Sequence, residues 1–409
     1  MIADLAALLA PVTPDAFFAD HYDKAPLHVR GDPAKFASVL SWRGINRLLD
    51  MTHAWTGTSL KLVLDSQTIP PESYCIRAQG RDGGAQLLQP DARLVQGWIA
   101  KGASVVMNDV DSLTPGLASV SNALESAGLG KSQANVYISW QSHKAFRTHY
   151  DTHDVWAVQV EGEKTWNIWE GRADWPIPHP AFRGQPQDHH DQARGKLRGT
   201  VLMKPGDLLY LPRGWYHDAL AEAPASVHIA YGVHAPLGMD LVNILVERVL
   251  YDAEFRRPLP RQDGSAPARF ALTQRAGLLG QRLAELCRDP KVLEVLAQFV
   301  AGYRHQRGGY DILASRGIAP PSAGDAAGGD APAFRVVAGG AKPVRRGAEW
   351  VVKTASGTLP LTPPEADAAA WLLARPDITA AELAQAHPGI DAAALVGRLA
   401  GAGLLAPAA

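Results

Sequence analysis

The stretch Thr148–Trp169, THYDTHDVWAVQVEGEKTWNIW, indicates the fold because two short runs with strand-like composition flank a short polar turn. VWAVQV and KTWNIW are rich in β-branched and aromatic residues, which is typical of strands. Glu161-Gly162 between them predicts a tight turn, so we interpret the segment as a β-hairpin. His149 and Asp151 stand just before the first run, and residues two apart in an extended strand share one face.

Short β runs continue on both sides of this stretch, from Ala134 to about His234. They are separated by turn sequences at Pro205-Gly206-Asp207 and Pro212-Arg213-Gly214. Regularly spaced short strands of this kind predict a small antiparallel barrel or sandwich. The further runs are ANVYISW, TVLM, LLYL and SVHIAYGV.

A neutral imidazole and a carboxylate on one face are the beginning of a metal site, and a second motif supplies a third ligand. In PGDLLYLPRGWYHDA the turn at Pro212–Gly214 returns the chain, so that His217 faces the same barrel mouth as His149 and Asp151. Two histidines and one carboxylate leave coordination positions open, as in non-haem Fe(II) oxygenases. The alternative is a set of hydrogen-bonded polar residues at the barrel mouth.

Two other His-x-Asp sequences are not expected to bind metal. His21 and Asp23 lie at the end of a helix that is predicted to begin after an N-cap at Thr13. His189 and Asp191 lie in a polar stretch without a strand pattern, where a solvated loop is expected.

From Asn135 to about His234 the sequence resembles the JmjC branch of the cupin superfamily, which are Fe(II)- and 2-oxoglutarate-dependent oxygenases, and most closely its ribosomal-oxygenase subgroup. ANVYISW, THYDTHDVWAVQVEGEKTWNIW and LMKPGDLLYLPRGWYHDAL carry the resemblance in order and spacing. It implies an α+β fold with a double-stranded β-helix (cupin/JmjC jelly-roll) core and flanking helices. It also implies a helical dimerisation segment and a C-terminal winged-helix-like domain.

The resemblance implies roles for residues of the barrel. His149, Asp151 and His217 correspond to the iron ligands. Lys164 corresponds to the residue that holds the distal carboxylate of 2-oxoglutarate, and Asn135 and Tyr137 lie where strand residues help to bind it. A lysine among apolar strand residues is costly to bury unless an anion meets it, which agrees with this assignment.

The roles of two further histidines stay open. His153 shares the two-residue spacing of Asp151, so it is either a contact outside the ligand set or part of a polar face. His228 faces either the cosubstrate or the core.

The β pattern stops after Gly238, and three runs with helical period follow. The first, MDLVNILVERVLYDAEF, is apolar around most of its circumference, which favours burial on two sides and agrees with a homodimer interface. In the tail, EWVVKTASGTLPL predicts strands, and three short helices follow, one of them opened by a capping box at Thr379 and Glu382. The predicted parts are a JmjC/cupin catalytic domain with an N-terminal extension at 1–236, a helical dimerisation domain at 237–312, a linker at 313–332 and a winged-helix-like domain at 333–409.

The composition of the 409 residues restricts the partners. With 40 basic and 41 acidic residues and no long run of either sign, the chain shows no feature that favours nucleic acid or an anionic membrane. Its two cysteines, far apart, exclude a disulfide framework and indicate a reducing compartment. No apolar stretch is long enough to span a bilayer, so we predict a cytoplasmic protein.

The expected activity, as the resemblance implies, is hydroxylation of a protein or peptide side chain, with a ribosomal protein as one candidate substrate. Fe(II) and O2 serve the reaction, and 2-oxoglutarate is converted to succinate and CO2. One alternative is a tailoring hydroxylase of a ribosomally made peptide. Another is a DNA-binding regulator, but the tail has only seven Lys and Arg against six Asp and Glu, and its helix DAAALVGRLAGAG holds one arginine.

Overall fold

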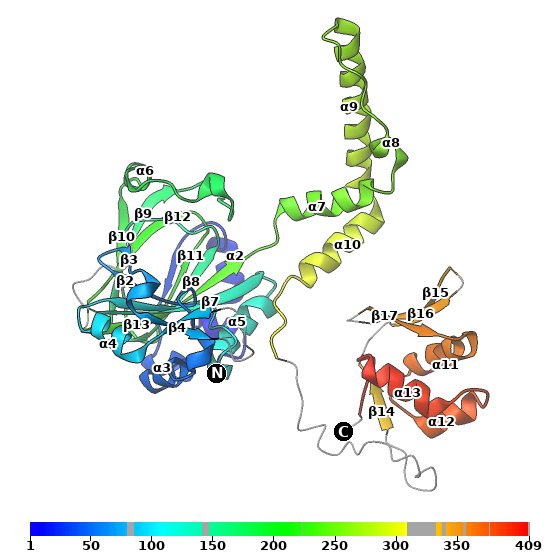
Figure 1. Cartoon of the computed structure of the whole chain (residues 1–409), viewed down its shortest axis with the longest axis horizontal. Coiled ribbons are helices and arrows are strands. Elements are labelled where there is room, and N and C mark those ends of the chain that lie inside the picture. Colours follow the sequence, from blue (N-terminus) through cyan, green and yellow to red (C-terminus); the bar gives the residue numbers. More distant parts are fainter. Residues whose placement is uncertain are drawn as a thin grey trace. The chain divides into compact units, whose positions relative to one another are not determined.

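The structure is a computed structural model, and it describes residues 1–79, 86–140, 147–222, 224–308, 333–337, 341–347, 349–354, 357–375 and 377–407. The chain divides into two compact units, Met1–Tyr310 and Asp311–Ala409 (Figure 1). The predicted linker at 313–332 lies outside the described residues. The four-part division of the chain stays a prediction.

The first unit contains two antiparallel sheets, which agree with the predicted β region. The larger sheet has the strand order β1-β11-β8-β13-β7-β6-β2-β3, and the smaller has the order β10-β9-β12. The strands of the larger sheet are β1 (Leu27–Val29), β2 (Leu60–Leu64), β3 (Gln67–Thr68), β6 (Ser104–Met107), β7 (Lys131–Trp140), β8 (Asp154–Glu161), β11 (Leu208–Leu211) and β13 (Ala225–His234). Those of the smaller sheet are β9 (Lys164–Arg172), β10 (Leu197–Met203) and β12 (Trp215–Ala221), and β4 (Cys75–Gln79) pairs separately with β5 (Gln86–Pro90).

Strand β8 shows why VWAVQV is apolar at all positions except Gln159. Trp156 and Val158 belong to the main core, where Trp156 packs against Phe17 of the N-terminal region. Val155 and Ala157 point to the opposite face and belong to a second, smaller core. A strand that is covered on both faces is apolar at most positions rather than at alternate ones, and the buried Gln159 donates to Ser226 Oγ at 2.8 Å.

The predicted hairpin between VWAVQV and KTWNIW is wrong. Strand β8 pairs with β11 and β13, whereas β9 pairs with β10 and β12. The turn at Gly162 has φ 60 and carries the chain from the larger sheet to the smaller one. Turn residues and strand pattern identify two consecutive strands, but their hydrogen-bonded partners come from segments farther along the chain.

Helices flank the sheets (Figure 1). The helix predicted after Thr13 is confirmed as α2, with the Thr13 hydroxyl accepting from the Ala16 amide. Its buried Phe17 joins the helix to the main core. The other helices before β13 are α1 (Leu5–Leu9), α3 (Trp42–Leu49), α4 (Ala92–Ile99), α5 (Pro115–Ser126) and α6 (Gln187–Ala193), with α2 at Pro14–Asp20. Short 3-10 turns lie at Pro33–Phe36, Thr52–Ala54, Pro71–Ser73 and Pro180–Phe182.

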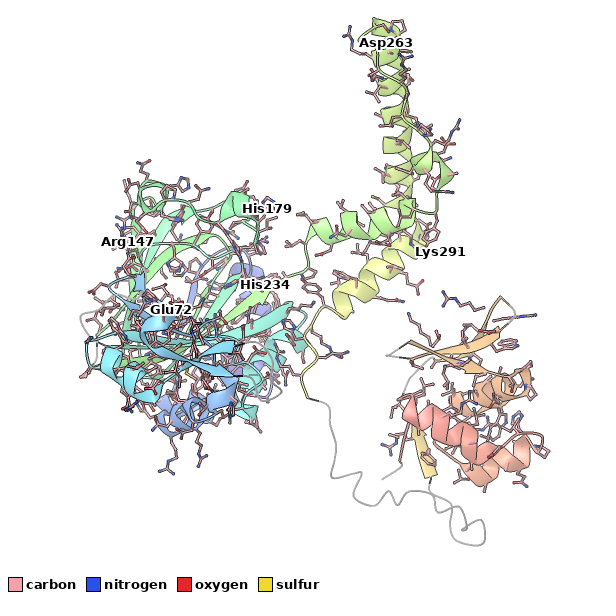
Figure 2. All side chains as sticks on the ribbon, viewed as in Figure 1. Glu72, Arg147, His179, His234, Asp263 and Lys291 are labelled. Carbon is pink, nitrogen blue, oxygen red and sulfur yellow. The ribbon has the colours of Figure 1, made fainter. Side chains whose placement is uncertain are left out.

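The predicted helical runs after Gly238 are confirmed as a helical arm, which consists of α7 (Gly238–Val249), α8 (Ala253–Arg256), α9 (Ala266–Leu286) and α10 (Pro290–Ala301). Side chains project from α9 on both visible sides, and none of its residues is buried (Figure 2). Leu245 is the one buried residue of α7, while Val242 and Val246 are 55% and 51% exposed. The helical arm therefore leaves much of its apolar surface uncovered within one chain.

Beyond α10 the chain returns to the sheet region through Arg307. Its Nε lies 2.6 Å from Asp111, and its Nη1 lies 2.6 Å from Glu125. The Arg307 and Glu125 side chains are almost completely buried, so this ion-pair group anchors the end of the helical arm to α5 and its surroundings.

The second unit is built from short strands and three helices, as predicted for the tail. The capping box at Thr379 and Glu382 is confirmed at the start of its middle helix. One sheet has the order β18-β14-β19 and the other the order β15-β16-β17. The elements are β14 (Ala333–Val336), β15 (Pro343–Arg346), β16 (Glu349–Thr354), β17 (Gly357–Leu361), α11 (Pro363–Leu373), β18 (Asp377–Thr379), α12 (Ala380–Ala386), α13 (Ala392–Gly401) and β19 (Leu405–Pro407).

The described parts of both units hold no helix that combines the length and the apolar character needed to cross a bilayer.

Candidate metal centre

A cavity of about 310 Å³ lies between the two sheets of the first unit. Strands β7, β8 and β13 of the larger sheet line it, and β9 and β12 of the smaller sheet complete its wall. All six residues predicted for the site line this cavity: His149, Asp151, His217, Lys164, Asn135 and Tyr137.

His149 and His217 lie directly opposite each other in a short antiparallel bridge. The His149 amide donates to the His217 carbonyl at 3.0 Å, and the His217 amide donates to the His149 carbonyl at 2.9 Å. Cross-strand partners place their side chains on the same face. The two imidazole rings accordingly lie with their centroids 4.6 Å apart.

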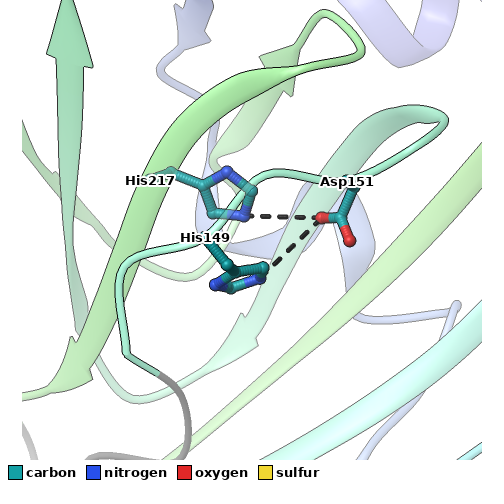
Figure 3. A group of neighbouring side chains, drawn as sticks. All are labelled: His149, Asp151 and His217. Atoms are coloured by element: carbon teal, nitrogen blue, oxygen red, sulfur yellow. Dashed lines mark ion pairs between the residues drawn. The ribbon is translucent and has the colours of Figure 1, made fainter. Parts of the chain in front are cut away.

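Asp151 completes the group from the segment between His149 and β8 (Figure 3). Its Oδ2 lies 3.5 Å from His217 Nε2 and 4.0 Å from His149 Nε2. One donor atom of each residue lies within 4.8 Å of the others, a spacing that a single metal ion can bridge.

His149 and Asp151 direct their side chains to one point, as expected, but they do not belong to the strand that follows them. Strand β8 begins only at Asp154, and His149 belongs to the isolated bridge with His217. The chain bends at Thr152 and His153, between this pair and β8.

Hydrogen bonds from the far side of each ring orient the two histidines. His149 Nδ1 lies 2.8 Å from the carbonyl oxygen of Arg147, and His217 Nδ1 lies 2.9 Å from that of Trp215. A carbonyl can only accept, so each Nδ1 carries the proton and each Nε2 presents a lone pair to the centre. This tautomer is the one that metal-ligating histidines use.

The electrostatics of the site also favour a bound cation. Burial, followed by the neighbouring His149, lowers the pKa of His217 to about 4, so its ring is neutral near pH 7. Burial alone would raise the pKa of the Asp151 carboxyl, but the nearby His153, His149 and His217 bring it below its ordinary value. Two imidazoles and one carboxylate fit Fe(II).

Lys164 lies in the same cavity, at the first position of β9, and its side chain is almost completely buried. Its Nζ lies 3.3 Å from Ser139 Oγ and 3.2 Å from His228 Nδ1, both on the larger sheet. Burial lowers the pKa of Lys164 to about 7. No described carboxylate forms an ion pair with it, so an anion that enters the cavity would meet an uncompensated cation or amine.

Strand β7 supplies Asn135 and Tyr137. The Asn135 Oδ1 accepts from the Asp109 amide at 3.1 Å, which fixes the side chain at the cavity edge. Tyr137 pairs with His228 of β13 in the sheet register, and their rings stack with centroids 4.8 Å apart.

Sequence reasoning left His228 open and did not name Ser139, yet both contact Lys164. A signal for His228 is present in SVHIAYGV, where His228, Ala230 and Gly232 alternate with larger apolar residues. This period of two separates the cavity face of β13 from its core face, and all three line the cavity.

His153 contacts the cavity as well, since it packs against Gly232. A Cβ atom added at Gly232 would lie 2.8 Å from the His153 ring, so only glycine admits the ring at this distance. His153 also lines a second cavity of about 280 Å³ beside the first.

The other His-x-Asp sequences lie away from the cavity lining. His21 caps the end of α2, and the Asp23 carboxylate pairs with Arg172 and accepts from Trp175 Nε1 at 3.0 Å. His189 and Asp191 lie on α6, so the predicted loop is a short helix. Asp191 pairs there with Arg147 at 3.6 Å.

The JmjC domain family matches residues 112–241, a range that contains the three convergent side chains and Lys164. This stretch is a JmjC domain. Curated relatives match a longer part of the chain, and among them are bifunctional lysine-specific demethylases and histidyl-hydroxylases named NO66. The protein of Drosophila persimilis is 28% identical over 268 residues, which is 63% of this chain and 36% of the relative. That of Aedes aegypti is 25% identical over 290 residues, 65% of this chain and 43% of the relative.

Solved structures of a ribosomal oxygenase, YcfD of Escherichia coli, match over almost the whole length. One is 18% identical with a TM-score of 0.49 and covers 97% of this chain and 98% of that chain. Another, in complex with cobalt and 2-oxoglutarate, is 17% identical with a TM-score of 0.46 and covers 98% and 99%. Roles of single side chains in the JmjC domain therefore rest on the geometry of the site itself.

Proposed function

We propose that the chain is an Fe(II)- and 2-oxoglutarate-dependent oxygenase that hydroxylates a side chain of a protein or peptide. The observation that carries this proposal is that His149, Asp151 and His217 direct one donor atom each to a common point in the cavity that also holds Lys164. Among the described residues, Lys164 is buried without a carboxylate partner, which supports an anionic cosubstrate next to the metal.

His149 Nε2, Asp151 Oδ2 and His217 Nε2 would hold the metal. Fe(II) bound there supplies the activation of O2, with 2-oxoglutarate as the reductant that leaves as succinate and CO2. The chain contributes the ligand geometry, and the carbonyls of Arg147 and Trp215 keep both rings in the ligating tautomer. Lys164 would bind the distal carboxylate of 2-oxoglutarate, with Ser139 and His228 as its hydrogen-bonding neighbours.

The test is turnover by the purified protein. We expect succinate to form from 2-oxoglutarate under air when Fe(II) is present, slowly without a protein substrate and faster with one. Succinate formation of equal rate with Zn(II) in place of Fe(II) would contradict the proposal, since zinc cannot activate O2.

The names of the relatives suggest the substrate class. The curated relatives are called histidyl-hydroxylases and lysine-specific demethylases, and the solved structures belong to a ribosomal oxygenase. We infer a protein substrate, with a ribosomal protein as the first candidate. The chain spans 36% of the length of its Drosophila persimilis relative, so the relative's two activities are candidates to be tested separately. A tailoring hydroxylase of a ribosomally made peptide would use the same centre.

We also propose that the helical arm forms a homodimer interface. The support is its uncovered apolar surface, including Met239, Val242, Val246 and Leu250 on or next to α7, each more than half exposed. Leu245, by contrast, is buried within the single chain.

The dimer proposal predicts that Val246→Glu converts the protein to a monomer, because an unpaired carboxylate would have to be buried between subunits. The mass is measured by light scattering at micromolar concentration, with the far-UV spectrum as a check on folding. An exposed arginine on the same helix gives the control: Arg248→Glu should leave the dimer largely intact. A wild-type monomer would refute the proposal.

The second unit is proposed as a winged-helix-like domain, on the support of its three helices and its β15-β16-β17 sheet. A DNA-binding regulator remains the alternative of another class. Arg398, the arginine of α13, forms an ion pair with Glu365 at 2.6 Å, which leaves less positive charge for phosphate binding. A cytoplasmic location stays a prediction from the sequence.

A further inference from the structure

We propose that the hydrogen bond between Thr148 and Asp218, here called the latch, positions His149 and His217, the two bridged histidines. Arg194 at the end of α6 holds the latch in place. The inference rests on the proposed metal centre, and it assigns positioning roles to residues that do not touch the metal.

The latch lies next to the antiparallel bridge between His149 and His217. Thr148 precedes His149 and Asp218 follows His217, so antiparallel pairing places them opposite each other on the side away from the cavity. The Thr148 hydroxyl donates to Asp218 Oδ2 at 2.8 Å. Thr148, the outward-facing neighbour of His149, is therefore hydrogen-bonded to Asp218, the outward-facing neighbour of His217.

Asp218 is fixed independently by the smaller sheet. It is 2% exposed, and it accepts from Asn167 Nδ2 at 3.1 Å and from Trp169 Nε1 at 3.1 Å, both on β9. A buried carboxylate is costly to leave without donors, so these bonds determine where the Thr148 hydroxyl finds its acceptor.

Helix α6 holds Thr148 from its other side. Arg194 Nη1 donates to Thr148 Oγ1 at 3.1 Å, while its guanidinium lies 3.9 Å from the centre of the Trp169 ring. Gln187 at the start of α6 donates to the Thr148 carbonyl at 3.0 Å. The hydroxyl thus accepts from Arg194 and donates to Asp218, and both ends of α6 reach the residue before the first ligand.

This arrangement matters because the bridge of His149 to His217 is isolated and β8 begins only at Asp154. Two backbone hydrogen bonds join the two residues, and the Gly214 amide donates to the Asp151 carbonyl at 2.9 Å. The latch adds a side-chain hydrogen bond to this short pairing, next to both imidazoles. A metal centre loses affinity when its ligands are displaced by a fraction of an ångström, so loss of the latch should lower the affinity for metal.

The experiment compares Thr148→Val, which keeps the side-chain shape and removes the hydroxyl, with Thr148→Ser, which keeps the hydroxyl. We expect Thr148→Val to weaken Co(II) binding roughly tenfold, which is the lower end of the effects seen for residues that orient metal ligands. The visible absorption of bound Co(II) should change as well. Thr148→Ser should restore both affinity and spectrum. A role in packing alone would leave the Co(II) spectrum of Thr148→Val unchanged.

Two further variants keep the test decisive if Thr148→Val folds poorly. Arg194→Met keeps a stem over Trp169 and removes the hydrogen bond to Thr148 together with the partly exposed ion pair to Asp191 at 3.9 Å, so we expect Co(II) binding to weaken roughly threefold. Asp207→Asn is the matched control because Asp207 is also buried and accepts from three donors, His28 Nε2 at 2.9 Å, the Gly31 amide at 3.0 Å and the Lys204 amide at 3.1 Å. It should lower the melting temperature without altering the Co(II) affinity.

The outcomes separate the two proposals. Failure of the wild-type protein to bind Co(II) at the cavity would remove the metal centre itself. A wild-type protein that binds Co(II), together with Thr148→Val and Arg194→Met variants of equal affinity and spectrum, would overturn the latch and leave the metal centre standing.

Discussion

Alanine at His149, Asp151 or His217 is expected to abolish succinate formation and to weaken Fe(II) or Co(II) binding by more than about a hundredfold. This loss exceeds the usual effect of substituting residues that only orient the ligands. Each of the three contributes one donor atom to a group that spans less than 4.8 Å, and the remaining two donors cannot hold a catalytic metal. Because the His217 side chain is also buried, His217→Ala should leave a small cavity and lower the melting temperature as well.

The measurement is a Co(II) titration followed by visible absorption, alongside the succinate assay. Asp23→Ala provides the control within the same sequence motif, since Asp23 pairs with Arg172 away from the metal donors. It should bind Co(II) and form succinate at the wild-type rate. Loss of metal binding in a folded Asp23→Ala variant would show that the metal centre has been assigned to the wrong His-x-Asp sequence.

The second large effect is expected at Lys164. Its ammonium would form a charge-assisted hydrogen bond with a carboxylate of 2-oxoglutarate, which is worth roughly 1.5 to 3 kcal/mol, or about tenfold to a hundredfold in affinity. Lys164→Met keeps an apolar stem and deletes the charge, so the affinity for 2-oxoglutarate should fall by that factor while Co(II) binding survives. Lys204→Met is the control, because Lys204 is exposed and pairs with Glu163 at 3.3 Å.

The same residue should make binding of 2-oxoglutarate depend on pH. Burial lowers the pKa of Lys164 to about 7, so above pH 7 the free protein holds mainly the neutral amine. A bound carboxylate favours the ammonium and raises this pKa, so binding takes up a proton. The affinity should therefore fall as the pH rises above 7, by up to about tenfold per pH unit, and should level off below pH 7 where the lysine is already charged.

Calorimetry measures this proton uptake directly. With Mn(II) at the metal centre and two buffers of different ionisation enthalpy at pH 8, the difference in heat gives the number of protons taken up. Lys164→Met should abolish the uptake. No uptake in the wild-type protein, with an affinity that is the same at pH 7 and pH 8.5, would show that Lys164 does not face the cosubstrate.

The sequence was sufficient for those features that depend on local pattern. Strand alternation and turn residues located β7, β8, β9, β11 and β13, and the caps located α2 and α12. The six predicted site residues do line one cavity. Their roles at the metal and at the cosubstrate stay predictions, which the experiments above address.

The features that could not be predicted depend on contacts between elements that are far apart in the sequence. The turn at Gly162 is visible in the sequence, but β8 and β9 pair with strands whose residues lie farther along the chain, and local pattern does not identify these partners. The contact of His228 with Lys164 depends on the register between β13 and β7 and on the distance between the two sheets. The helix α6 consists of QDHHDQA and has no buried residue, so it lacks the apolar periodicity that would predict a helix.

The side chains on the cavity face of β13 differ in size from one end of the cavity to the other. Along this strand the side chains shrink from His228 beside Lys164, through Ala230, to Gly232 beneath His153. At roughly 3.3 Å per residue these positions span about 13 Å. The His153 ring fills the space that the missing side chain of Gly232 leaves, so this face of the cavity has a lysine end and a histidine end. If Lys164 holds the distal carboxylate as proposed, a larger substrate would meet His153 rather than the lysine.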